Sequence, residues 1–171
     1  MRGRLVTGST LLLWLALAGH SAAAGMSPVG LWQAADPETK KPSGWFAITE
    51  HDGVYNGTLV KMFLKPGQNL NVVCHVCKGD RHNQPWLGLQ IIRGMKPDGD
   101  NQFDSGTILD PRSGNVYDAM MTLSPDGQTL IVRGFLGIPL LGRNEYWKRV
   151  QDSAYSTLDP KIKSMLDSSA K

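Results

Sequence analysis

The sequence predicts an all-β protein: a single antiparallel up-and-down barrel of about eight strands, with a short C-terminal helix or tail. Short apolar and β-branched runs recur along the chain, most clearly from 117 to 149, and turn sequences such as those at 52–53 and 124–127 separate them. Nineteen Gly and ten Pro, spread along the chain, favour strands and turns over helices. Consecutive strands joined mostly by short turns favour closure, because a closed barrel leaves no open sheet edge.

In chain order, we expect strands at 31–34, 45–50, 54–63, 87–95, 102–109, 116–123, 129–135 and 144–150. The stretch from 65 to 84 has no sustained period and is expected to be a long loop. Asp159-Pro160 favours a short helix through Met165, although a frayed tail is equally compatible with these residues.

The first 24 residues have the features of a secretory signal peptide. Arg2 and Arg4 precede an apolar run at 11–18, and the small residues at 22–24 predict cleavage after Ala24. An uncleaved membrane anchor is the alternative, but the apolar run is short for a span. We therefore expect a barrel domain at 25–150 and a tail at 151–171, in a periplasmic or secreted protein with no membrane span after signal cleavage.

Charge and motifs exclude several classes of function. The predicted signal holds two Arg and no acid, so 16 of the 18 basic residues remain against 15 acidic ones, a net charge of +1. No basic stripe is left, so nucleic acid is not an expected partner. The chain has no Gly-x-Ser-x-Gly sequence and no glycine-rich phosphate loop, and a strand-end carboxylate such as Asp110 beside Pro111 is typical of a turn. We expect no enzyme activity and no cofactor.

An eight-stranded barrel is just wide enough to be filled by its own side chains or to hold one small ligand. The leading interpretation is a binding module for a small apolar or amphipathic molecule; the alternative is a structural or interaction module of the cell envelope, with a filled barrel and an envelope protein as partner. The apolar segment 134–142 is either a lid folded over the barrel end or an exposed patch. The candidate ligand contacts are Tyr117, Met121, Val132, Arg133, Phe135 and Leu136.

The sequence Cys74-His75-Val76-Cys77 has three possible roles. In an oxidising compartment a disulfide is the default, and closing so short a loop contributes only about 2 kcal/mol. Thiol redox chemistry is a second role, although no thioredoxin-like pattern surrounds the pair. Metal binding by Cys74, Cys77 and His82 is a third, but the spacing matches no standard site, and we expect no metal.

Short motifs at both ends of the predicted barrel resemble those of known proteins. Gly30-Leu31-Trp32 and Tyr146-Trp147-Lys148-Arg149 resemble the motifs at the two ends of lipocalin-like barrels, and that resemblance implies that Trp32 stacks on Arg149 where the barrel closes. The stretch 29–150 also resembles an exported bacterial family, domain of unknown function 2147, which implies the barrel and export but no activity. This second match depends on Gly30-Leu31-Trp32, Asp110-Pro111, Gly114, Tyr117, the run 130–134 and Trp147-Lys148-Arg149.

Overall fold

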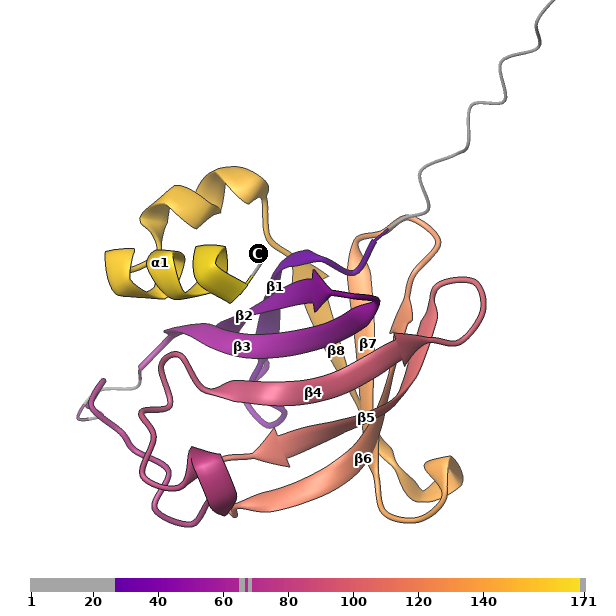
Figure 1. Ribbon diagram of the computed structural model, residues 1–171, viewed down its shortest axis with the longest axis horizontal. Helices are drawn as coiled ribbons and strands as arrows, with labels where there is room; N and C mark the ends of the chain where they lie inside the picture. Colours follow the sequence, from indigo (N-terminus) through magenta and orange to yellow (C-terminus); the bar gives the residue numbers. More distant parts are fainter. Residues whose placement is uncertain (1–26, 65–66, 68, 170–171) are drawn as a thin grey trace, which may run out of the picture.

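The computed structural model describes residues 27–64, 67 and 69–169, so the expected signal peptide lies outside the described residues. Its centre is a closed barrel in which each strand pairs antiparallel with its neighbours in sequence and the first strand pairs with the last (Figure 1). The predicted fold class is confirmed. The strands are β1 (Gly30–Ala35), β2 (Pro42–His51), β3 (Val54–Met62), β4 (Gln90–Pro97), β5 (Gln102–Asp110), β6 (Asn115–Leu123), β7 (Thr129–Phe135) and β8 (Arg143–Arg149).

The strand boundaries follow the local turn chemistry. Asp52 and Gly53 both have positive φ, 50° and 75°, as a two-residue hairpin turn of the favoured hand requires. Two strands begin three residues away from the predicted position: β2 begins at Pro42 rather than at Trp45, and β4 begins at Gln90 rather than at Leu87. Gly88 has a φ of 92°, which interrupts the extended backbone, yet its N–H still donates to the Leu59 carbonyl of β3 at 2.8 Å.

Side chains of the barrel itself fill the interior. Trp32, Met121 and Leu130 are fully buried, and Phe46 stacks on Trp147 with ring centroids 4.4 Å apart. Glycines in the wall make room for side chains that lie against them. A Cβ added to Gly106 would lie 2.6 Å from the Met95 sulfur, and one added to Gly57 would lie 3.0 Å from Ile92. Around these residues the interior of the barrel is as tightly packed as an ordinary protein core.

Arg149 joins the first strand to the last. Its guanidinium carbon lies 4.2 Å from the centre of the Trp32 ring, which is the stacking that the lipocalin resemblance implies. Arg149 also donates to the carbonyls of Gly127, Val29 and Ser27 at 2.6, 3.0 and 2.8 Å. The Trp32 indole N–H in turn donates to the Pro28 carbonyl at 2.7 Å. These contacts connect the segment before β1, the β6–β7 turn and the end of β8.

The two ends of the barrel differ in their connections. At one end, here called the turn end, β2–β3, β4–β5 and β6–β7 are joined by short turns at 52–53, 98–101 and 124–128. At the other, the loop end, lie the connections 36–41, 63–89, 111–114 and 136–142. In Figure 1 the connections of the loop end lie along the lower side of the barrel and the turns lie to the right and upper right.

The C-terminal segment crosses the outside of the barrel. It consists of a 3₁₀ helix, η3 (Asp152–Thr157), and the helix α1 (Pro160–Ser169), which lie beside β1, β2 and β3 in Figure 1. Of the two alternatives for these residues, a short helix or a frayed tail, the structure has the helix, which continues beyond Met165. The Asp159 carboxylate caps it by accepting from the Lys161 N–H at 2.8 Å. None of the helices in the described part of the chain is long and apolar enough to cross a bilayer.

Candidate functional site

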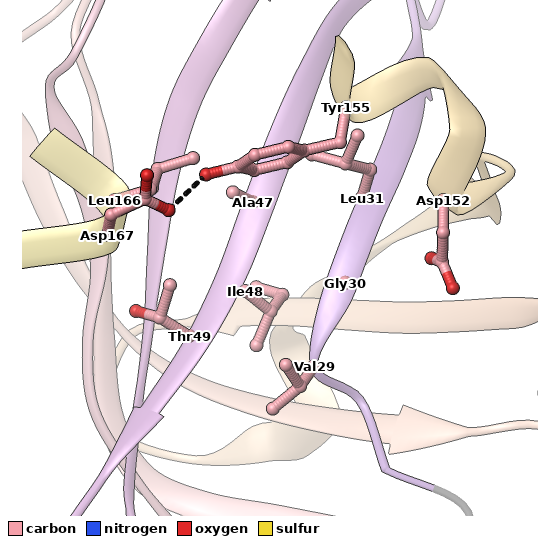
Figure 2. A pocket seen from close by; sticks show the side chains of 10 residues that line it. All are labelled: Val29, Gly30, Leu31, Ala47, Ile48, Thr49, Asp152, Tyr155, Leu166 and Asp167. Atoms are coloured by element: carbon pink, nitrogen blue, oxygen red, sulfur yellow. Dashed lines mark hydrogen bonds between the residues drawn. The ribbon is translucent and has the colours of Figure 1, made fainter. Parts of the chain in front are cut away.

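A groove of about 440 Å³ lies between the C-terminal segment and the outer face of β1 and β2 (Figure 2). Strand residues form its floor, and residues of η3 and α1 form one side. In Figure 2 the Tyr155 ring lies across the top of the groove, above Leu31 and Ala47. The lining residues are Val29, Gly30, Leu31, Ala47, Ile48, Thr49, Asp152, Tyr155, Leu166 and Asp167.

The groove exists because the first three strands carry apolar residues on both faces. Along β1 and β2, Leu31 and Ala47 are cross-strand partners whose side chains face outward, while their neighbours Trp32 and Ile48 belong to the interior. Leu31, Ala47 and Val60 form a second buried cluster outside the barrel wall. Its other members are Leu158, which lies between η3 and α1, and Ile162 and Leu166, which are four residues apart and therefore share one face of α1.

Tyr155 and Asp167 hold the C-terminal segment in place over the groove. The Tyr155 hydroxyl donates to the Asp167 carboxylate at 2.7 Å, which connects η3 to the last turn of α1. This hydrogen bond to a carboxylate raises the pKa of Tyr155 to about 12, because the neutral phenol can donate and the phenolate cannot. Tyr155 therefore remains a neutral donor throughout the physiological pH range.

The chemistry of the groove is an apolar floor with oxygen atoms at its edge. Leu31, Ala47 and Leu166 provide aliphatic surface, while the exposed carboxylates of Asp152 and Asp167 and the hydroxyl of Thr49 are hydrogen-bond acceptors. Asp152 also interacts electrostatically with Arg149, which lies next to the groove at the barrel seam. Such a site suits an apolar group that carries a hydrogen-bond donor or a positive charge.

The structure does not bring the six residues predicted as ligand contacts into one site. Met121 and Val132 face each other across β6 and β7, with 0 and 1% of their surface exposed, so they belong to the packed interior. Tyr117 is half-buried on β6, and its hydroxyl accepts from the Asn115 amide at 3.4 Å. Their role as ligand contacts remains a prediction, and none of them lines the groove.

Arg133, Phe135 and Leu136 lie at the loop end, where β7 leaves the barrel. Arg133 donates to the carbonyls of Pro139 and Leu140, at 2.8 and 3.2 Å, so its guanidinium binds the chain's own backbone. Leu136 is 67% exposed. Of the two alternatives for segment 134–142, the exposed patch describes its tip.

The long loop 63–89 contains the disulfide. Cys74 and Cys77 are bonded to each other and buried, which confirms the expected disulfide, and Cys74 Sγ lies 3.3 Å from the Pro111 carbonyl oxygen. Gly114 lies so close to the backbone of Val76 that no larger residue would fit without movement. The disulfide therefore anchors the long loop against the β5–β6 turn. Both cysteines belong to the core cluster of the barrel, so the end of the barrel is covered by this loop and not by segment 134–142.

Polar contacts also hold this loop. Asp80 accepts two hydrogen bonds from Arg93 of β4, at 2.7 and 3.0 Å, and this pairing lowers the pKa of the Asp80 carboxyl. His82, a candidate metal ligand, has its Nδ1 3.0 Å from the Cys77 carbonyl oxygen, and the sulfurs of Cys74 and Cys77 are bonded to each other. Within the described ranges, no three His, Cys, Asp or Glu side chains converge as a metal site would require.

Sequence reasoning missed the groove, although a signal for it was present. Pairs of consecutive apolar residues occur on three successive strands, at 31–32, 47–48 and 59–60. Consecutive residues of a strand point to opposite faces of the sheet, so such pairs indicate that both faces of these strands are covered. Apolar residues four apart follow at Leu158, Ile162 and Leu166. Together these two patterns indicate that a C-terminal helix covers the first strands.

Comparison with solved structures agrees with this architecture. The chain is similar to a protein described as "Protein HP1028 from the human pathogen Helicobacter pylori belongs to the lipocalin family", with a TM-score of 0.69 and 15% sequence identity. The match covers 85% of this chain and 99% of the other. The protein is therefore a lipocalin-like barrel.

A family model extends this from class to family. Residues 30–149 match domain of unknown function 2147, described as an uncharacterised protein conserved in bacteria, and the chain belongs to this family. The match spans β1 to β8 and so covers the whole barrel. No curated protein matches the chain.

Proposed function

We propose that this protein is an exported binding protein for a small amphipathic molecule, and that the molecule binds in the outer groove rather than inside the barrel. The observation that carries the proposal is the groove itself: about 440 Å³ with an aliphatic floor. Small-molecule sites typically have volumes of about 300–1,000 Å³ and apolar walls with a few polar groups. Export is the inference from the signal sequence, and the cell envelope is the compartment that we propose.

The interior offers less support for a ligand. The rings of Phe46 and Trp147 stack in the interior, and the exposed fractions of Met121, Leu130 and Val132 are 0, 0 and 1%. A ligand at that level would have to displace packed side chains, and opening a cavity in a packed core costs several kcal/mol.

The edge of the groove narrows the class of ligand. Asp152 of η3 and Asp167 of α1 place two carboxylates at the edge, and Thr49 of β2 adds a hydroxyl. An amine or another hydrogen-bond donor on the ligand would find acceptors there, while an anionic headgroup would be repelled. We therefore propose an apolar body with a neutral or cationic donor group.

A second candidate function, contact with another component of the cell envelope, is favoured by the exposed aliphatic loop between β7 and β8. The two functions are compatible, because the groove lies on the outer face of β1 and β2 and the loop lies at the loop end of the barrel.

The test is calorimetric titration of residues 25–171 with dodecylamine and with dodecyl sulfate, each below its critical micelle concentration. Val29→Trp should fill the groove from a residue that is already 41% exposed, and Val116→Trp is the matched control, 44% exposed and outside the groove. We expect dodecylamine to bind the wild type and the Val116→Trp variant with similar affinity, and to bind the Val29→Trp variant at least tenfold more weakly. We also expect the wild type to bind dodecyl sulfate at least tenfold more weakly than dodecylamine. Equal affinity of Val29→Trp and wild type for dodecylamine, or no binding by the wild type, would overturn the proposal.

A further inference from the structure

The β7–β8 connection at 136–142 exposes aliphatic side chains to an unusual degree. Leu136, Ile138, Leu140 and Leu141 are 67, 54, 82 and 75% exposed, within six consecutive residues. The other short connections of the barrel are built from turn residues such as Asp, Gly, Ser and Pro. Contiguous aliphatic groups in water usually mark a surface that contacts something else.

The structure holds this loop in its exposed position. A short 3₁₀ helix, η2 (Pro139–Leu141), forms its tip, and Arg133 donates to the carbonyls of Pro139 and Leu140 and to the Asn144 side chain at 2.8, 3.2 and 2.6 Å. Gly142 packs against the Gly134 carbonyl oxygen, which lies 2.7 Å from the position of an added Cβ. The aliphatic groups are therefore presented in a fixed arrangement, so a contact with them costs little conformational entropy.

Further exposed aliphatic residues lie at the same end of the barrel. Val116 lies at the start of β6, two residues before Asp118, which pairs with Phe135 at the base of the loop. Val76, in the disulfide loop, contacts Gly114 next to that strand. Both valines are about half exposed. The apolar surface thus continues from the β7–β8 loop towards the disulfide.

The connections at the two ends of the barrel also differ in charge. The three connections of the turn end contain four aspartates and no basic residue. The described residues in the connections of the loop end include five basic and three acidic ones, and Arg143 follows the exposed loop directly. The five basic residues are Lys40, Lys41, Lys78, Arg81 and Arg112, and the three acidic ones are Asp36, Glu38 and Asp80.

We propose that the loop end of the barrel docks on an anionic phospholipid surface, with Leu136, Leu140 and Leu141 inserted between the lipids. A bilayer accepts projecting aliphatic side chains without a complementary pocket, and anionic headgroups attract the basic residues around them. The four aspartates in the connections of the turn end are repelled by the same surface, which favours contact through the loop end. Protein interfaces, by contrast, depend mostly on aromatic and arginine anchors, and the tip from 136 to 141 has neither.

This docking does not depend on the groove, and vesicle flotation tests it. We expect residues 25–171 to float with vesicles of phosphatidylethanolamine and phosphatidylglycerol, and at least tenfold less with phosphatidylcholine alone. Replacing both Leu140→Ser and Leu141→Ser should lower the partition coefficient at least tenfold, with an unchanged circular dichroism spectrum because both side chains are exposed. Tyr146→Ser, which removes a 57% exposed side chain from the barrel wall, is the matched control and should bind as wild type.

A second measurement reports insertion directly. Both cysteines of the chain are in the disulfide, so Leu140→Cys provides a single site for a bimane label, and Gln102→Cys at the turn end provides the control. Brominated lipids should quench the label at 140 and not the one at 102. Wild-type protein that does not float with anionic vesicles, or quenching that is equal at both sites, would overturn the proposal. A photoreactive residue at 140 that crosslinks only to a protein would also overturn it, in favour of a protein partner.

Discussion

Replacing Arg149 with methionine tests whether the seam between β1 and β8 depends on this side chain. Methionine keeps much of the aliphatic stem but removes the guanidinium that lies over Trp32 and donates to three carbonyls. Arg143→Met on the same strand is the matched control, because Arg143 is exposed and lies away from the seam.

The expected loss follows from the partners left behind. Gly127 is buried, so its carbonyl loses a charged donor that water replaces poorly, at a cost of about 1–3 kcal/mol. The carbonyls of Ser27 and Val29 belong to exposed residues that water can reach, and they add about 0.5 kcal/mol each. The lost cation–π contact with Trp32 adds about 1 kcal/mol. We expect the free energy of unfolding to fall by about 3–5 kcal/mol in total.

Equilibrium unfolding in urea, followed by tryptophan fluorescence, measures this change. With a denaturant slope of about 1.5 kcal/mol per M, a loss of about 3–5 kcal/mol moves the midpoint by about 2–3 M. Arg149→Lys should recover only part of the loss, because an ammonium group cannot reproduce the planar stacking and the fork of donors. A midpoint shift below about 0.3 M for Arg149→Met, or an equal shift for Arg143→Met, would refute the proposed role.

Three further predictions concern other parts of the molecule. Replacing Cys74 and Cys77 together with serine should cost about 2–4 kcal/mol, from lost loop closure and two buried hydroxyls, while far-ultraviolet circular dichroism still shows the barrel; loss of the strand signal would contradict this. Tyr155→Phe should lower stability by about 1 kcal/mol at pH 8. Since the pKa of Tyr155 is raised to about 12, the wild-type advantage should be complete below about pH 10 and lost as pH rises towards 12, and a difference that is constant from pH 8 to 12 would rule the hydrogen bond out as its cause. Gly106→Ala should lower the melting temperature through a loss of about 1–3 kcal/mol, because the new methyl group meets the sulfur of Met95; an unchanged melting temperature would show that the interior can adjust.

Most of the barrel was predictable because its information is local. The hairpin at Asp52-Gly53 and the turn at 124–127 fix which residues pair, and strands connected by short turns form neighbouring pairs. The error at β4 has the same local character. A glycine such as Gly88 adopts a positive φ without strain, and composition alone does not say that it does so here.

The candidate sites were harder to predict because they depend on contacts between distant segments. The groove requires that the outward faces of β1 and β2 meet a helix more than a hundred residues later in the chain. The loop was recognisable from the sequence as apolar, but its exposed position depends on hydrogen bonds from Arg133 to Pro139 and Leu140. The sequence analysis had instead predicted that Arg133 contacts a ligand. In both cases the residue types were visible and their partners were not.

The C-terminal helix has a consequence for the exposed surface of the barrel. Leu158, Ile162 and Leu166 follow all eight strands in the chain, so Leu31, Ala47 and Val60 stay uncovered until the C-terminal segment packs on them. A polypeptide that stops at Val150 contains all eight strands of the barrel, but Leu31, Ala47 and Val60 form an exposed apolar surface on its outer face. We therefore expect deletion of η3 and α1 to leave a closed barrel that self-associates through this uncovered apolar surface.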